Sequence, residues 1–253
     1  MPTVQAINIA PVKSLGLLHP QTVSVGETGV IGDRRFCVED ELGKMLTQRQ
    51  VGKMVQVRAQ YHRKPESLRL VFPDGRVVEG TPVLGKPTQI KIGSREVPGR
   101  AVEGDWSAAL SDYCGRPARL VQVNASHHYQ DLYPVSLLSQ ASVDELSRRS
   151  NGQTRFDARR FRPTFLLEGC RPHEEDSWEG RTVRIGEQLR LRIAARDPRC
   201  VITRLNPDTG ERDADTLSLI LDYRPDPTGI YFGVYATVEQ PGLVSIGDEI
   251  TLV

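Results

Sequence analysis

Short runs of alternating apolar and polar residues fill most of the chain, and proline or glycine separates them. Strict alternation is typical of a half-buried β-strand. Pro73-Asp74-Gly75 predicts a turn, because proline presets φ and glycine accepts a positive φ. Many short strands between regular turns predict a small barrel or sandwich. We expect strands at residues 4–9, from about 36, and at 55–57, 68–72, 77–78, 89–92, 96–97, 119–123, 165–168, 182–186, 189–193, 230–239 and 245–253.

Three stretches interrupt this pattern with helices. The apolar side chains of residues 106–113 share one face at helical spacing, and Asp105 is expected to cap that helix. Ser142 and Glu145 have the spacing of a capping box, which predicts the start of a second helix. A short third helix is expected at 217–221. The fold class is therefore mainly β with a few short helices (β/α+β).

Residues 125–131 are interpreted as a boundary loop. They contain His127 and His128, but adjacent histidines point apart and no third ligand follows at a typical spacing. The stretch is therefore a linker rather than a metal site. It divides the chain into two expected β-barrel-like lobes, 1–124 and 125–253.

Charge argues against a partner bound through bulk electrostatics. Lys+Arg is 33 and Asp+Glu is 32, a net charge of +1, which disfavours a nucleic-acid binder. Lys91 is the last lysine, so every later cation is arginine, whose planar fork suits phosphate and carboxylate. Compositional bias of a GC-rich genome explains most of that excess, although individual arginines remain candidates.

The N-terminus and the cysteines indicate a cytoplasmic protein. The four cysteines form no Cys-x-x-Cys pair. The N-terminus lacks a basic region followed by an apolar run, so no signal peptide is expected. No stretch approaches the roughly 20 apolar residues that span a bilayer. We therefore expect free thiols in a reducing cytoplasm and no membrane association.

Cys200 is the strongest candidate for a reactive or metal-binding side chain. It follows the alternating segment 189–193, Pro198 breaks that strand, and Arg199 places a guanidinium next in sequence. A nearby cation stabilises a thiolate, which is the form that binds a soft metal. The alternative is a small buried hydrophobe, the usual role of a free cysteine and the one that local chemistry alone favours.

Several other short motifs are suited to an anion, each with a simpler alternative. Lys13-Ser14 follows a strand, and an ammonium with a hydroxyl can hold a phosphate. Residues 139–142 open a helix, where exposed N–H groups form an anion site, although simple capping suffices. The basic stretch 155–164 either clamps a phosphate or covers a solvated turn. The acidic run 173–176 is interpreted as a surface loop.

In this order the motifs resemble those of the MOSC-domain proteins, in the branch with an N-terminal β-barrel domain that includes the mitochondrial amidoxime-reducing component and its bacterial relatives. The resemblance spans about residues 4–253. It rests on Pro11-Val12-Lys13-Ser14, Gly32-Asp33-Arg34-Arg35-Phe36, Leu46-Thr47-Gln48-Arg49, Ser139-Gln140-Ala141-Ser142, Phe161-Arg162-Pro163, Pro198-Arg199-Cys200 and the closing Gly247-Asp248.

The resemblance implies an N-terminal MOSC-associated β-barrel, residues 1–124, followed by a MOSC β-barrel, residues 125–253, with a molybdenum cofactor (Mo-molybdopterin) between them. Cys200 would be the catalytic residue and the thiolate ligand of the metal. The cofactor's phosphate would be bound by Lys13, Ser14, Arg34, Ser139, Ser142, Arg162 and Arg199. Arg34 rather than Arg35 is aligned with the family's arginine. Thr164 departs from the family pattern, which often has asparagine after the Arg-Pro pair and so a further polar contact.

The implied activity is reduction of small N-hydroxylated compounds: amidoximes, hydroxylamines and N-hydroxylated bases. No cysteine follows Cys200, so we expect no four-cysteine iron–sulfur cluster, and electrons would come from a separate flavin or iron–sulfur reductase. Two alternatives remain. One is a sulfur-carrier or cofactor-handling MOSC protein that uses a Cys200 persulfide. The other is a non-catalytic β-barrel binding module.

Overall fold

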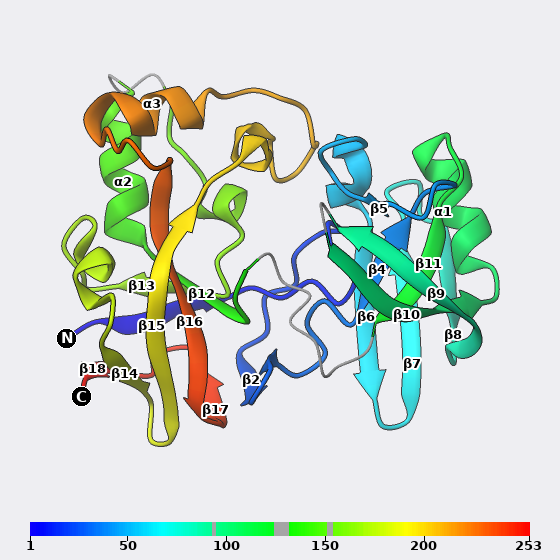
Figure 1. Ribbon diagram of the computed structural model, residues 1–253, viewed down its shortest axis with the longest axis horizontal. Helices are drawn as coiled ribbons and strands as arrows, with labels where there is room; N and C mark the ends of the chain where they lie inside the picture. The colour runs from blue at the N-terminus through cyan, green and yellow to red at the C-terminus, as the bar shows by residue number, and fades with distance from the viewer. Residues whose placement is uncertain (93–94, 124–131, 151–153) are drawn as a thin grey trace.

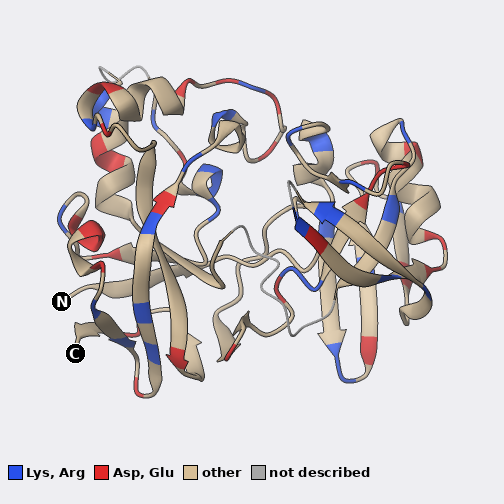
Figure 2. Cartoon of the chain, in the orientation of Figure 1, with Lys and Arg blue, Asp and Glu red and all other residues tan. Residues whose placement is uncertain are grey.

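A computed structural model describes residues 1–92, 95–123, 132–150 and 154–253 (Figure 1). Within these residues the chain is mostly β, with three short α-helices, and it forms two lobes side by side. The predicted fold class is confirmed. Acidic and basic positions are interspersed over both lobes (Figure 2), in line with the small net charge.

A seven-stranded, nearly closed sheet builds the lobe that holds most of the C-terminal half. Its neighbouring strands are antiparallel except for the parallel pair β12–β13. A three-stranded sheet packs on the same core. The strands of the seven-stranded sheet, in spatial order, are β1 (Thr3–Ile7), β13 (Phe165–Glu168), β12 (Val135–Ser139), β16 (Tyr231–Gln240), β15 (Leu189–Pro198), β14 (Thr182–Ile185) and β18 (Ile250–Leu252). Those of the three-stranded sheet are β17 (Gly242–Ser245), β2 (Thr22–Gly26) and β3 (Gly29–Val30).

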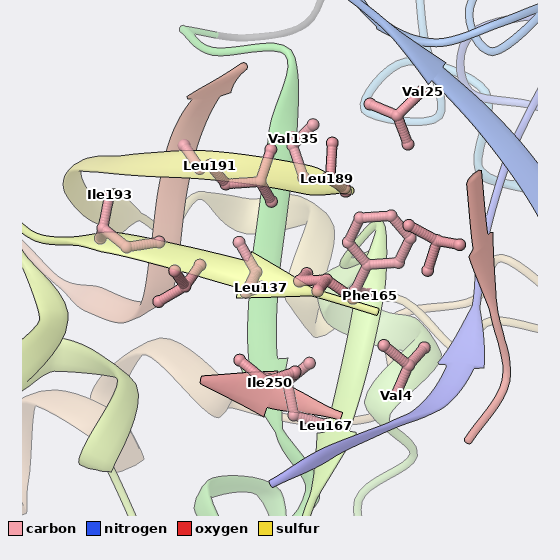
Figure 3. Packing of buried hydrophobic residues seen from close by; sticks show 14 of the residues in the cluster. Val4, Val25, Val135, Leu137, Phe165, Leu167, Leu189, Leu191, Ile193 and Ile250 are labelled. Atoms are coloured by element: carbon pink, nitrogen blue, oxygen red, sulfur yellow. The ribbon is translucent and has the colours of Figure 1, made fainter. Parts of the chain in front are cut away.

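The inward residues of these strands form one apolar core (Figure 3). Val4 and Val25 from the N-terminal strands contact the same cluster as Leu137, Phe165 and Leu191, and all five side chains are buried. Each such side chain contributes about 1.5–3 kcal/mol when it leaves water. The strands β1, β2 and β3 therefore pack in the second lobe, although the sequence assigns them to the first, whereas Val12 and Leu15 between β1 and β2 belong to the core of the other lobe. The division at residues 124 and 125 stays a prediction.

The other lobe combines a five-stranded and a three-stranded sheet with one helix. Phe36, Leu70, Phe72, Trp106 and Leu110 belong to its buried core. The strands of the five-stranded sheet, in spatial order, are β5 (Met45–Leu46), β4 (Phe36–Glu39), β11 (Arg119–Val123), β10 (Arg95–Glu103) and β9 (Val83–Ile92). Those of the three-stranded sheet are β6 (Arg58–Arg63), β7 (Glu66–Val71) and β8 (Val77–Gly80). The helix is α1 (Trp106–Cys114).

All three predicted helices form, but two of the predicted caps are wrong. Helix α1 begins after Asp105, whose side chain makes no capping hydrogen bond. Helix α2 (Gln140–Arg149) is capped by Ser139, which accepts from the backbone N–H of Ser142. The preceding strand β12 delivers the chain in extended form to Ser139, so the helix begins three residues earlier than the capping box predicts. Helix α3 (Thr216–Tyr223) covers the predicted segment.

Two further sequence interpretations are wrong. Residues 55–57 are not a strand, because the 3₁₀-helix η1 (Gly52–Gln56) ends there and buries Met54 and Val55. The acidic run is not entirely at the surface, since η3 (Glu174–Trp178) buries Glu175 completely. The other 3₁₀-helices are η2 (Ala158–Phe161) and η4 (Val201–Arg204). The boundary loop 125–131 lies outside the described residues.

Among the described residues, no helix is long and apolar enough to cross a bilayer.

Candidate functional site

A cavity of about 460 Å³ lies between the lobes and takes its lining from both. The first lobe contributes the loop after β1, the turn before β4 and the β5 segment. The second contributes the η2 segment and the end of β15. Of the predicted site residues, the lining includes Lys13, Ser14, Arg34, Arg162, Arg199 and Cys200. Side chains up to 187 positions apart in sequence therefore meet in one space.

Cys200 is presented to this cavity by the end of a strand. β15 stops at Pro198, which has no N–H to continue the ladder, and η4 starts one residue after Cys200. The thiol is half-buried and unpaired with any other cysteine. Burial raises the pKa of the Cys37 and Cys170 thiols to about 12, so those two remain protonated at neutral pH. Cys200 is the accessible sulfur beside a cation.

That cation is Arg49 rather than Arg199. The Nη2 of Arg49 donates to Cys200 Sγ at 3.0 Å, across 151 positions of sequence. The guanidinium of Arg199 turns inward instead and donates to the carbonyl oxygens of Phe232 and Phe161 at 2.7 and 2.9 Å. Arg199 therefore holds the loop in place, and a residue from the other lobe supplies the positive charge expected at the thiol.

Three predicted phosphate ligands hold an unusual backbone. Ser14, Arg34 and Arg162 have φ of 71°, 46° and 50°, and His173 is the fourth non-glycine residue with a positive φ in the described chain. This left-handed region costs about 1–2 kcal/mol for an L-residue. Three of four such positions line one cavity, as expected where a binding site fixes the backbone.

Neighbouring groups fix two of these side chains. Arg34 pairs with Asp33, whose other carboxylate oxygen accepts from the backbone N–H of Ala10 at 2.7 Å. Arg162 Nη2 donates to the carbonyl oxygen of Leu15 at 2.8 Å. The lining includes Arg34 and not Arg35, which donates to the carbonyl oxygen of Val123 at 2.9 Å.

Ser139 and Ser142 do not line the cavity. Both are fully buried, and both form hydrogen bonds with the carboxyl group of Glu175. Its Oε1 accepts from the backbone N–H of Ser139 at 3.1 Å and from the hydroxyl of Ser142 at 2.8 Å. Burial raises the pKa of the Glu175 carboxyl above its ordinary value. The phosphate contact predicted for the two serines stays a prediction that this geometry does not support.

Thr164, which departs from the family pattern, lines the cavity and is paired locally. Its Oγ1 accepts from the backbone N–H of Ser136 at 3.2 Å, and its own N–H donates to Ser136 Oγ at 3.0 Å. Sequence reasoning did not assign a role to Arg49, Lys44 or Lys91. The motif Thr47-Gln48-Arg49 was the only available signal for Arg49, and nothing marked the lysines.

The residues present fit an anionic cofactor with one protein thiolate. The described residues contain no group of three or more histidine, cysteine or acidic side chains that could hold a bare metal ion. A single half-buried sulfur suits a metal that is mainly bound by another molecule. A phosphate accepts hydrogen bonds from cations and hydroxyl groups, and the cavity offers both in Lys13, Ser14, Arg34 and Arg162.

Two family profiles cover the chain. The MOSC N-terminal beta barrel domain matches residues 1–117, and the MOSC domain matches residues 124–251. The chain belongs to the MOSC family. This confirms the resemblance found in the motifs.

Curated relatives are similar over nearly the whole chain. The mitochondrial amidoxime-reducing component 1 of Mus musculus is 28% identical over 99% of this chain and 82% of its own length. The molybdenum cofactor sulfurase of Oryza sativa subsp. japonica is 23% identical over 94% of this chain but 32% of its own length. Among solved structures, the YuaD protein of Bacillus subtilis aligns with a TM-score of 0.46 at 14% identity, over 100% of this chain and 96% of that one. The MOSC family and the two curated relatives point to a function related to the molybdenum cofactor.

Proposed function

We propose that this MOSC-family protein is a molybdenum-cofactor-dependent oxidoreductase that reduces N-hydroxylated compounds with electrons from a separate partner protein. Amidoximes, hydroxylamines and N-hydroxylated bases are the substrate class. One observation carries the proposal: the Cys200 thiol lies in the same cavity as Lys13, Ser14, Arg34 and Arg162. The names of the full-length relatives supply the reaction class.

The overall reaction replaces an N–OH bond by N–H and releases water, which consumes two electrons and two protons. The cofactor supplies the two-electron chemistry, while the protein supplies binding, orientation and charge. Cys200 is the metal ligand in this proposal. Lys13, Ser14, Arg34 and Arg162 bind the phosphate and fix the orientation of the cofactor.

Arg49 and Arg199 have separate roles. Arg49 stabilises the negative charge of the sulfur through its hydrogen bond to Sγ. Arg199 pairs with Asp197 at 2.7 Å and ties the loop that carries Cys200 to β16. The partner's identity, the cytoplasmic location and the lobe division at 124 and 125 stay predictions.

The test compares the wild type with Cys200→Ser, both expressed in a host that makes the cofactor. We expect near-stoichiometric molybdenum by elemental analysis in the wild type and little in the variant. Wild-type protein should then reduce benzamidoxime with a chemical electron donor. Folded wild type with neither molybdenum nor pterin would refute the proposal and favour a sulfur carrier or a binding module.

A second candidate is a sulfur carrier in which Cys200 bears a persulfide, and the similarity to molybdenum cofactor sulfurase favours it. Such a carrier should not retain stoichiometric molybdenum through gel filtration. It should instead show one additional sulfur atom on Cys200 by mass spectrometry after incubation with a donor persulfide, which passes its outer sulfur to the thiol and leaves as a thiol.

A further inference from the structure

The cavity is far more basic than the chain as a whole. A single carboxylate, Asp197, lines it among the described residues, and it is paired with Arg199. Figure 2 shows basic positions on both lobes where they face each other. The cations of the lining are Lys13, Arg34, Lys44, Arg49, Lys91, Arg160, Arg162 and Arg199.

Most of these cations have a defined partner. Arg160 forms a two-bond pair with Asp213 at 2.6 and 2.8 Å, which lowers the pKa of that carboxyl. Arg34 pairs with Asp33, and Arg162 reaches Leu15. Arg34, Arg162 and Lys13 are the cations that the proposed function assigns to the cofactor's phosphate. Lys44 and Lys91 remain.

Lys44 and Lys91 lie side by side on neighbouring backbone segments. A bridge pairs the two residues, and the backbone N–H of Lys91 donates to the carbonyl oxygen of Gly43 at 2.8 Å. Both side chains are exposed at the cavity. Like charges directly opposite one another repel, so an anion bound by both lysines would relieve that repulsion.

Nearby carboxylates do not neutralise the pair. Asp40 Oδ1 accepts from the backbone N–H groups of Leu42 and Lys44 at 2.9 Å, and Glu41 pairs with Arg116 at 3.5 Å. Glu96 lies opposite Lys91 in the β9–β10 register, yet no ion pair in the described part of the chain includes it or either lysine. Two ammonium groups are therefore available to one external anion.

The same cavity has an apolar wall suited to a flat molecule. The rings of Tyr133 and Tyr235 lie 5.6 Å apart, and both residues line the cavity with Met45 and Ile92. Met45 and Ile92 directly follow Lys44 and Lys91 on extended backbone, so their side chains turn to the opposite face, where they pack with a buried apolar cluster. The two tyrosine rings are therefore the wall that a flat ligand would meet. A planar ligand can use both features at once.

We propose that Lys44 and Lys91 form a subsite for an anionic group carried by the substrate. The substrate class becomes a planar N-hydroxylated compound with a carboxylate or phosphate remote from its N–OH group. The N–OH part of this inference rests on the proposed function, whereas the anion subsite rests on the cavity alone.

A binding experiment tests the subsite without turnover. Benzoate, phenyl phosphate and neutral benzamide are titrated into cofactor-loaded protein by calorimetry. We expect both anions to bind about tenfold more tightly than benzamide, the size expected of two exposed ion pairs. In a Lys44→Gln/Lys91→Gln variant this preference should disappear, and a stronger response of phenyl phosphate than of benzoate would identify phosphate as the preferred anion.

Lys86→Gln is the matched control, because Lys86 is an exposed lysine of the same strand β9 outside the cavity lining. It should keep the preference of the wild type. An equal affinity of the wild type for benzoate, phenyl phosphate and benzamide would overturn the inference, as would an unchanged preference in the double variant.

Kinetics separates this inference from the proposed function. With 4-carboxybenzamidoxime and benzamidoxime as substrates, the wild type should show a KM about tenfold lower for the anion. The double variant should lose that ratio. If neither compound is reduced although the anion preference is present in calorimetry, the proposed function fails and the subsite stands.

Discussion

At the scale of single residues, the cavity is marked by backbone strain more clearly than by its side chains. Serine and arginine have no special tolerance for positive φ, yet Ser14, Arg34 and Arg162 all adopt it. Interactions elsewhere in the fold must offset the free energy that these three residues lose in the left-handed conformation. Such strain persists at functional sites, where a ligand needs a side chain that glycine lacks.

Ser14 offers a direct test of this strain. Ser14→Gly and Ser14→Ala both remove the hydroxyl, but only glycine relieves the backbone. We expect the free energy of unfolding of the glycine variant to exceed that of the alanine variant by about 1 kcal/mol, measured by urea denaturation. Both variants should contain less molybdenum than the wild type. Equal stabilities of the two variants would show that the left-handed backbone costs nothing here.

At the scale of elements, the start of α2 is a structural network in this fold. The hydroxyl of Ser142 donates to Glu175, contacts Ser139 Oγ at 2.6 Å and accepts from the backbone N–H of His173 at 2.8 Å. Burial and the adjacent Arg224 lower the pKa of His173 to about 4, so its ring is neutral at physiological pH. This network ties α2 to η3 through buried polar groups.

Ser142→Ala should therefore change stability and spare the cofactor. Loss of a hydrogen bond to a buried carboxyl costs about 1–3 kcal/mol, which thermal unfolding will show as a lower Tm. Ser218→Ala, at an exposed position in the first turn of α3, is the control and should change stability much less. Molybdenum per folded protein should equal that of the wild type. Its loss from folded Ser142→Ala protein would instead make Ser142 a cofactor ligand, as the family resemblance implies.

The elements show what sequence patterns can and cannot predict. Alternation found most strands and helical spacing found the first helix, because those patterns depend on which face of one segment is buried. A capping-box motif indicated the second helix, three residues after its actual start. Residues 55–57 look like a strand, but tertiary packing of Met54 and Val55 overrides that preference. The cation at Cys200 was misassigned to the adjacent Arg199, because nothing local says that Arg49 lies 3.0 Å away. The buried position of Glu175 also depends on packing alone.

At the scale of the whole molecule, the site exists only while the two lobes stay in register. The first lobe contributes Arg49 to a sulfur of the second, and the second contributes Arg162 to a carbonyl oxygen of the first. The strands β1, β2 and β3 pack in the second lobe, while Val12 and Leu15 between β1 and β2 pack in the core of the first, so the chain crosses between the lobes more than once. The lobes also touch directly where Gly52 meets Gly210, so closely that a Cβ on Gly52 would overlap the carbonyl oxygen of Gly210.

Gly52→Ala should separate the lobes at this point. The backbone of Gly52 is not in the left-handed region, so alanine adds no φ strain and the overlap is the whole effect. We expect lower molybdenum content and a lower Tm. Gly26→Ala is the control, because its nearest neighbour would be Ile31 at 3.7 Å, an ordinary contact. Full molybdenum content in Gly52→Ala would show that the cavity tolerates a shift between the lobes. Loss of molybdenum with an unchanged Tm would show that lobe apposition serves the cofactor site more than the stability of the fold.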